Sequence, residues 1–201
     1  MFTGIVTDVG TVRSVEQRGD LRLVIGTDYD MGTVDLGASI ACSGVCLTVV
    51  DKGDDWFVVD VSGETVSRTA HDLWREGATL NLERPLRMGD EIGGHILTGH
   101  VDAVGEVIEA KPEGDSVRIE VRVPFELGPM IAPKGSIALD GVSLTVNGVK
   151  DVGNGTLFTI NIIPHTAHET TFGGIARGRQ LNVEVDVLAR YIDRMLAARS
   201  Q

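Results

Sequence analysis

The chain has 201 residues, of which 42% are hydrophobic and 23% charged, and its formal net charge is −11. This mix is that of an ordinary soluble protein, long enough for one large domain or two domains of about 100 residues. The negative charge argues against a nucleic-acid or anionic membrane surface. No apolar run approaches the ~18 residues that a membrane span needs, and the N-terminus does not resemble a signal peptide. We therefore expect a cytoplasmic protein that binds neither nucleic acid nor membrane.

The chain repeats itself after about half its length. The opening MFTGIVTDVGTV aligns with GGHILTGHVDAVGEV at 93–107, and SIACSGVCLTVV from Ser39 aligns with SIALDGVSLTVN from Ser136. Further on, WFVVDVSGET aligns with LFTINIIPHT, and GATLNLE aligns with GRQLNVE. The offset grows from 95 (98 − 3) to 101 (178 − 77), as insertions in loops between fixed elements would produce. Four blocks in the same order indicate a tandem duplication.

Each unit has the pattern of an all-β domain. Apolar and polar residues alternate over 117–123, 158–162 and 180–187, which predicts half-buried strands. About six short strands per unit, with glycine at the corners, favour a small closed barrel, because closure removes exposed sheet edges. The joint between the units is expected over 84–94, where proline, glycine and charged residues cluster.

The two cysteines, Cys42 and Cys46, lie four residues apart in an apolar run. On a regular strand their Cα atoms would be ~13 Å apart, whereas a disulfide needs less than ~7 Å. We therefore expect free thiols, which fits a reducing compartment. Neither cysteine belongs to a CxxC pair, so a zinc site has little support.

Cys46 and Ser143 occupy the same place in the repeat, each after a glycine turn and before a Leu-Thr-Val strand. They are either structural hairpin corners or a shared binding feature. No Ser-His-Asp order supports a hydrolase. His95 and His100 are five apart on a predicted strand, so they would point to opposite faces, and a structural role is expected. The segment 162–171 is either a loop of hydrogen-bonding groups or the start of a helix capped by threonine.

The last segment changes period and predicts a helix of about four turns. Its apolar residues recur at three and four positions and are Leu188, Tyr191, Ile192, Met195 and Leu196. This face either covers its own barrel or packs against copies of the chain. Sequence reasoning leaves both alternatives open.

Several motifs together resemble riboflavin synthases of the α-subunit, two-barrel family. They are MFTGIV, CLTV after a glycine turn, GGHILTGHVD, DGVSLTV, IIPHT and NVEVD before the terminal helix, and they span essentially the whole chain. The resemblance implies an all-β fold, a tandem duplication of two six-stranded Greek-key barrels plus a C-terminal α-helix. The implied domains are lumazine-binding barrels at 1–88 and 89–186 and an oligomerisation helix at 187–201.

The resemblance also implies a reaction. In that family two molecules of 6,7-dimethyl-8-ribityllumazine exchange a four-carbon unit, giving riboflavin and 5-amino-6-ribitylaminouracil. A cofactor-independent transferase is implied, acting as a homotrimer whose site joins the first barrel of one subunit to the second barrel of the next. An association with lumazine synthase stays open. The alternative is a non-catalytic lumazine or flavin carrier of the antenna type. The polar residues that the second half retains favour the enzyme.

The family's site residues can be carried over by motif. The N-terminal pocket would use Gly4, Ile5, Val6, Ser39, Cys46, Leu47, Thr48, Asp60, Val61, Ser62, Gly63, Glu64 and Thr65. The C-terminal pocket would use Gly99, His100, Val101, Lys134, Ser143, Leu144, Thr145, Ile163, Pro164, His165, Thr166, Ala167 and His168. Activity would depend most on Phe2, Cys46, His100, Ser143 and Asp186.

Two of these assignments stay open. Ser143 and Asp186 could each serve as nucleophile or proton relay, and Asp186 could instead only cap the helix. The family more often has an acidic residue where this chain has His165, which puts a polar role of His165 in doubt.

Overall fold

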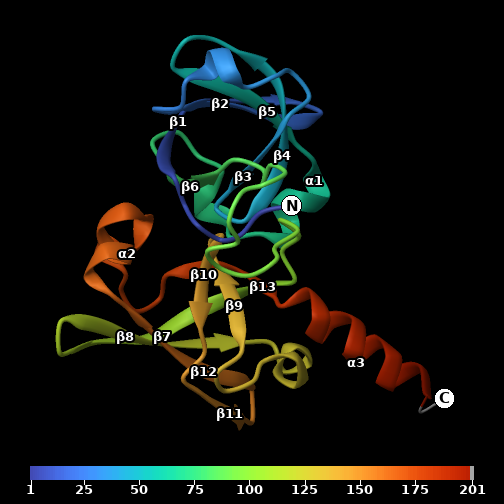
Figure 1. Ribbon diagram of the computed structural model, residues 1–201, viewed down its shortest axis with the longest axis vertical. Helices are drawn as coiled ribbons and strands as arrows, with labels where there is room; N and C mark the ends of the chain where they lie inside the picture. The colour runs from blue at the N-terminus through green and yellow to red at the C-terminus, as the bar shows by residue number, and fades with distance from the viewer. Residues whose placement is uncertain (200–201) are drawn as a thin grey trace.

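A computed structural model describes residues 1–199, which form a closed six-stranded barrel, a second unit built on a seven-stranded sheet, and a C-terminal helix (Figure 1). We call the second unit the second barrel, although its sheet has seven strands and is not closed as the resemblance implied. The predicted all-β duplication with a terminal helix is confirmed. No helix within residues 1–199 is long and apolar enough to cross a membrane. Ser200 and Gln201, the end of the predicted segment 187–201, lie outside the described residues.

The first barrel is closed in the order β1-β2-β5-β4-β3-β6, in which β2 to β5 follow a Greek-key arrangement. Its strands are β1 (Asp8–Arg18), β2 (Asp20–Gly26), β3 (Ser39–Cys42), β4 (Val45–Lys52), β5 (Trp56–Val61) and β6 (Thr79–Glu83). The helix α1 (Gly63–Arg68) and the 3-10 turns η1 (Met31–Thr33) and η2 (His71–Leu73) connect them. Alternate side chains point inward and form the core, in which Leu23, Ile25 and Phe57 are fully buried.

The second unit is a seven-stranded sheet, β10-β9-β13-β7-β8-β12-β11. Its strands are β7 (Ala103–Glu113), β8 (Ser116–Val123), β9 (Ser136–Leu139), β10 (Val142–Thr145), β11 (Gly148–Val152), β12 (Gly155–Ile162) and β13 (Gln180–Val185). The short helical elements are η3 (Phe125–Met130), α2 (Pro164–Glu169) and η4 (Thr171–Gly174). The range 162–171 is thus the end of a strand followed by a helix, rather than a loop.

The second unit has a seventh strand because β10 and β11 together correspond to the single strand β4 of the first unit. β10 and β11 lie at the two ends of the sheet, yet they follow each other in the chain. Their counterpart β4 is continuous and has a register shift between Val49 and Asp51, the positions that align with the break at Val146 to Gly148. The backbone still joins across the break, since the Asn147 amide donates to the Thr159 carbonyl (2.7 Å). The second unit therefore has a strand break at the positions where the first unit has a bulge-type irregularity.

The terminal helix α3 (Val187–Arg199) extends away from both barrels (Figure 1). Its base is tied to the second barrel by an ion pair between Arg190 Nη2 and Asp102 Oδ2 (2.8 Å). The predicted apolar face is solvent-exposed, by 57% to 69% for Leu188, Tyr191 and Ile192. Within one chain the helix therefore does not bury this face against its own barrel.

Two hairpin turns bring the barrels into contact. Ser43–Gly44 joins β3 to β4, and Asp140–Gly141 joins β9 to β10. Both residues of each turn have positive φ (44° and 80°, then 44° and 77°), the conformation of a type I′ turn. The turn glycines face each other so closely that a Cβ on Gly44 would lie 2.8 Å from the Gly141 amide nitrogen. No larger residue fits at this contact.

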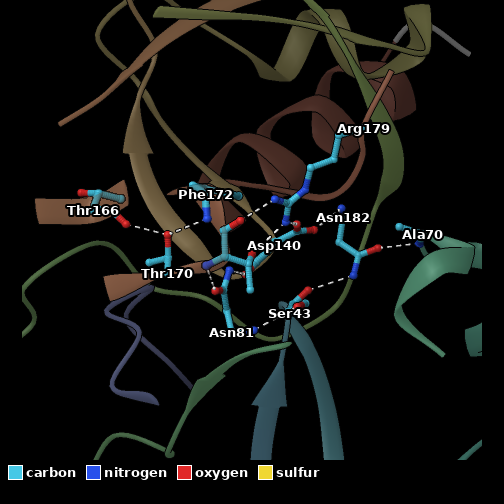
Figure 2. A network of polar contacts seen from close by, with 10 residues as sticks. Ser43, Ala70, Asn81, Asp140, Thr166, Thr170, Phe172, Arg179 and Asn182 are labelled. Atoms are coloured by element: carbon cyan, nitrogen blue, oxygen red, sulfur yellow. Dashed lines mark hydrogen bonds and ion pairs between the residues drawn. The ribbon is translucent and has the colours of Figure 1, made fainter. Parts of the chain in front are cut away.

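Two buried asparagines complete the junction in a pseudo-symmetric way (Figure 2). Asn81 of β6 donates to the Asp140 carbonyl (3.0 Å) and accepts from the Thr171 amide (2.8 Å). Asn182 of β13 donates to the Ser43 carbonyl (2.8 Å) and accepts from the Ala70 amide (2.8 Å). Each side chain satisfies one backbone donor and one backbone acceptor of the opposite unit, which buried groups require.

The junction is not fully symmetric, because Asp140 stands where the first unit has Ser43. Its carboxylate accepts from the Asn182 amide (2.8 Å) and from Arg179 Nη2 (2.9 Å) (Figure 2). Burial raises the pKa of Asp140 to about 6, although the Arg179 guanidinium acts in the opposite direction. The second unit thus carries an ion pair between the buried Asp140 and the half-buried Arg179, at the place where the first unit has the Ser43 hydroxyl.

We predict that Asn182→Ala lowers the free energy of unfolding by about 2–3 kcal/mol, because it leaves the buried Ala70 amide and Ser43 carbonyl without partners. Urea denaturation followed by circular dichroism measures the change. The exposed Asn154 serves as a control, and Asn154→Ala should cost less than about 0.5 kcal/mol. Equal losses for the two variants would contradict a stabilising role of the junction.

Candidate active site

The segments that precede β1 and β7 each cross to the other barrel. The Ser143 amide of β10 donates to the Gly4 carbonyl (2.9 Å), and the Cys46 amide of β4 donates to the Gly99 carbonyl (2.9 Å). Between these contacts Phe2 and Leu97 form an antiparallel bridge, with N to O distances of 2.9 and 3.0 Å. The exchanged segments therefore place residues of one unit beside the nucleophile-capable side chain of the other.

This exchange corrects the predicted grouping of the pocket residues. Sequence reasoning placed 4–6 with Cys46 and 99–101 with Ser143, because each segment was assigned to the barrel that follows it. In the structure Val6 packs against the core of the second barrel, and Val101 packs against that of the first. The residues were grouped by chain order, whereas the segments run antiparallel to each other between the barrels.

Glycine is required at both crossing points. Gly4 and Gly99 have φ of +77° and +76°, which side chains with a Cβ rarely adopt. A Cβ on Gly4 would lie 2.5 Å from Ser143 Cβ, and one on Gly99 would lie 2.6 Å from Cys46 Cβ. The close approach keeps the two backbones in hydrogen-bonding distance.

The first site is a cavity of about 200 Å³. Its lining combines β4, α1 and the exchanged segment, and consists of Val45, Cys46, Glu64, Thr65, Arg68, Thr69, Gly99, His100 and Val101. The Ser62 hydroxyl accepts from the Thr65 amide (3.2 Å) and so caps α1 where the helix meets the cavity. Cys46 is half-buried and Cys42 is fully buried. Both are free thiols, as predicted.

The second site contains a contact that sequence reasoning did not anticipate. Ser143 Oγ and His95 Nδ1 are 2.7 Å apart. The range 93–102 is irregular rather than a strand, so the prediction that His95 and His100 face opposite sides of a strand is wrong. Burial lowers the pKa of His95, while the negative charges of Asp186 and Glu184 act against this shift. A neutral imidazole beside a hydroxyl can accept or donate a proton, depending on its tautomer.

The other residues expected to carry activity have varied surroundings. Phe2 is 2% exposed and packs with Leu97 at the junction, where it holds the exchanged segments together. His100 lies exposed at the first site, and its carbonyl accepts from Arg190 (3.4 Å). Asp186 Oδ1 accepts from the Leu188 amide (2.9 Å), the contact of a helix cap, and Asp186 also acts electrostatically on His95.

The remaining predicted binding residues lie on or beside strands and helices of the two units, and those of the first unit are not among the lining residues of the first site. On the first unit Ser39 pairs in register with Thr48, and Asp60 forms an exposed ion pair with Arg22 (3.3 Å). On the second unit Lys134 is exposed with φ +67°, and its amide donates to the Val146 carbonyl (2.8 Å). The structure places Leu47, Val61 and Gly63 on or beside β4, β5 and α1, and Leu144, Thr145, Ile163, Pro164, His165, Thr166, Ala167 and His168 on or beside β10 and α2.

Two buried carboxylates that sequence reasoning missed hold the exchanged segments. Glu83 accepts from the Thr3 amide (2.6 Å), the Thr3 hydroxyl (2.9 Å) and the Gly4 amide (3.0 Å). Glu184 repeats this pattern with the Thr98 amide (2.7 Å), the Thr98 hydroxyl (2.6 Å) and the Gly99 amide (3.0 Å). Their shared place at the end of the NLE and NVE blocks was the available signal.

Comparison with known proteins agrees with this duplicated architecture. The family model of the lumazine binding domain matches residues 3–85 and 98–186. Two solved structures of LumP are similar, one complexed with riboflavin (TM-score 0.82, 26% identity) and one with 6,7-dimethyl-8-(1'-D-ribityl) lumazine (TM-score 0.79, 25% identity). Each similarity covers 92% of this chain and 99% of the other chain. The fold and the paired sites thus define a protein of two lumazine-binding domains.

Curated relatives narrow the class further. The chain is 50% identical to riboflavin synthase of Brucella abortus (strain 2308), covering 97% of this chain and 98% of the relative. It is 40% identical to riboflavin synthase of Mycobacterium bovis, covering 98% of each chain. The chain belongs to the riboflavin synthase family.

We predict that Gly99→Ala destabilises the protein more than Gly77→Ala. Both glycines have positive φ, which costs about 1–2 kcal/mol for a residue with a Cβ. The Gly77 position is open, whereas a Cβ at Gly99 meets Cys46, which adds about 1–3 kcal/mol. The difference in unfolding free energy between the two variants isolates the contact of the exchanged segment. Similar losses would mean that the segment can move away at little cost.

Proposed function

We propose that the protein is a riboflavin synthase, which converts two molecules of 6,7-dimethyl-8-ribityllumazine into riboflavin and 5-amino-6-ribitylaminouracil. The observation that carries this proposal is the duplication of one site within one chain. Cys46 and Ser143 occupy equivalent positions, each bound through its amide to a glycine carbonyl of an exchanged segment. A reaction whose donor and acceptor are the same compound needs such a matched pair of sites.

Orientation is the main contribution expected of the protein. The substrate supplies its own electrophilic C=N bond and an acidic methyl group, and fixing two rings in a reactive geometry can supply ~7–11 kcal/mol of the barrier. Acid–base assistance adds a smaller factor of ~10²–10⁴. We assign catalytic roles to Phe2, Cys46, His100, Ser143 and Asp186. The contact of Ser143 with His95 supports proton handling at the second site.

The two sites differ chemically, which supports distinct roles for donor and acceptor. The first site offers the half-buried Cys46 thiol, and the second offers the Ser143 hydroxyl with an imidazole 2.7 Å away. The imidazole at the first site, that of His100, is exposed, whereas the His95 ring at the second site is half-buried. Asymmetry is therefore built into the duplicated frame.

A non-catalytic carrier is the alternative, favoured by the likeness to LumP structures that hold riboflavin or a lumazine. The higher identity to riboflavin synthases supports the enzyme. The second site also keeps its polar side chains, among them Lys134, Ser143 and Thr166.

We predict that purified protein mixed with 6,7-dimethyl-8-ribityllumazine alone forms riboflavin. One mole of riboflavin should appear for every two moles of the lumazine consumed. Absorbance and chromatography of both products measure the ratio. Cys46→Ser combined with Ser143→Cys exchanges the two functional groups and should lower turnover, while binding persists. Tight binding by the parent protein without turnover would establish a carrier instead.

We further propose that the protein is a cytoplasmic homotrimer. Each chain would have barrels at 1–88 and 89–186, and the helix at 187–201 would join the three chains. Free thiols support a reducing compartment. The exposed apolar face of α3 supports assembly, because an apolar stripe on a helix is stable when another surface covers it. Association with lumazine synthase stays a prediction from resemblance.

We predict that Ile192→Asp disrupts this assembly and lowers turnover, because it places a charge in the apolar face of α3. Ala197→Asp is the control, because Ala197 lies on the opposite side of the helix. It adds the same charge and a similar cost in helix propensity. Light scattering should show a trimer for the parent and for Ala197→Asp, and smaller species for Ile192→Asp. A trimer in all three proteins would contradict assembly through this face.

A further inference from the structure

The carboxylates of Glu83 and Glu184 are buried without a cation. They are 6% and 3% exposed, and neither forms an ion pair within residues 1–199. Burial raises the pKa of Glu83, while hydrogen bonds from Thr3 and Gly4 act against this shift. A buried carboxylate is costly unless hydrogen bonds compensate it. Each of these carboxylates has its compensation in three donors of one exchanged segment.

The geometry extends from each carboxylate to the site on the opposite barrel. Glu83 lies at the end of β6 in the first barrel and fixes the Gly4 amide, and the Gly4 carbonyl then accepts from Ser143 of the second barrel. Glu184 lies near the end of β13 in the second barrel and fixes Gly99, whose carbonyl accepts from Cys46 of the first. Since two donors on successive residues meet two carboxylate oxygens, the orientation of the peptide is fixed as well as its position.

We propose that Glu83 and Glu184 are positioning residues with crossed control: Glu83 sets the geometry of the second site, and Glu184 sets that of the first. Neither touches the reacting atoms in this scheme. Each acts through a glycine whose carbonyl holds the backbone of Ser143 or Cys46. Each barrel thereby completes the site of the other, which makes the two sites depend on each other's framework.

Thiol chemistry can report on each site separately. Cys46 is the reporter of the first site in the parent chain, because Cys42 is fully buried. Cys46→Ser combined with Ser143→Cys moves the reporter to the second site. Each reporter is combined with Glu83→Gln, with Glu184→Gln or with the exposed control Glu76→Gln, which removes the same charge. Gln keeps the size of Glu but turns one acceptor into a donor that faces an N–H group.

The rate of labelling by a disulfide reagent is measured with and without riboflavin. We expect Glu184→Gln to change the rate at Cys46, and Glu83→Gln to change the rate at the thiol from Ser143→Cys, by about tenfold. Glu83→Gln should leave the rate at Cys46 within about twofold, as should Glu76→Gln for both reporters. Glu184→Gln also removes a charge that acts on His95 beside Ser143. Thr98→Val keeps that charge, so this variant tests whether the reporter at the second site stays within about twofold. Riboflavin protection should be lost in the same crossed pattern.

Equal effects on both reporters, or an effect confined to the barrel that carries the glutamate, would overturn the inference, because a merely structural role predicts these results. If a Gln variant does not fold, Thr3→Val and Thr98→Val replace it, since each removes one donor to the same carboxylate. The inference rests on the proposed function only for the choice of riboflavin. If riboflavin protects neither parent thiol, the proposed ligand fails, while labelling without ligand still decides the crossed control.

Discussion

The arrangement of the two units depends on the contact between the turns Ser43–Gly44 and Asp140–Gly141. A Cβ on either glycine would lie within 2.8 Å of the opposite amide nitrogen, so the approach is set by backbone alone. Because β4 and β10 begin directly after these turns, the contact also sets where Cys46 and Ser143 lie. The asparagines Asn81 and Asn182 satisfy the buried backbone groups that this approach takes away from water.

The exchange of segments follows from the same approach. With the turns in contact, the chain before β1 and the chain before β7 run antiparallel between the barrels, joined at Phe2 and Leu97. Each segment then reaches the first residues of β10 or β4 of the opposite unit, while Glu83 or Glu184 of its own unit holds it in place. The backbone contacts of Gly4 with Ser143 and of Gly99 with Cys46 thus join each unit to the other.

Duplication supplies a symmetric frame, and a few residues make the sites chemically different. Cys46 and Ser143 are equivalent in position but offer a thiol and a hydroxyl. His95 places a half-buried imidazole against Ser143 at the second site, and Asp140 with Arg179 adds an ion pair to the second half of the junction. A reaction that treats two identical substrates differently requires asymmetry of this kind, and here it costs few changes to the fold.

The sequence by itself determined the duplication, the strands and the turns, because periodicity, glycine placement and internal alignment are local properties of the chain. It also determined the family, since the motifs MFTGIV and GGHILTGHVD keep their order and spacing. Only the tertiary structure decided which segment completes which site, that His95 meets Ser143, and that Glu83 and Glu184 hold the exchanged peptides. These contacts join residues 48 to 86 positions apart or cross between the units, and local patterns carry no information on such pairings. The exposed face of α3 was likewise settled by the position of the helix away from both barrels, which its period of three and four residues could not reveal.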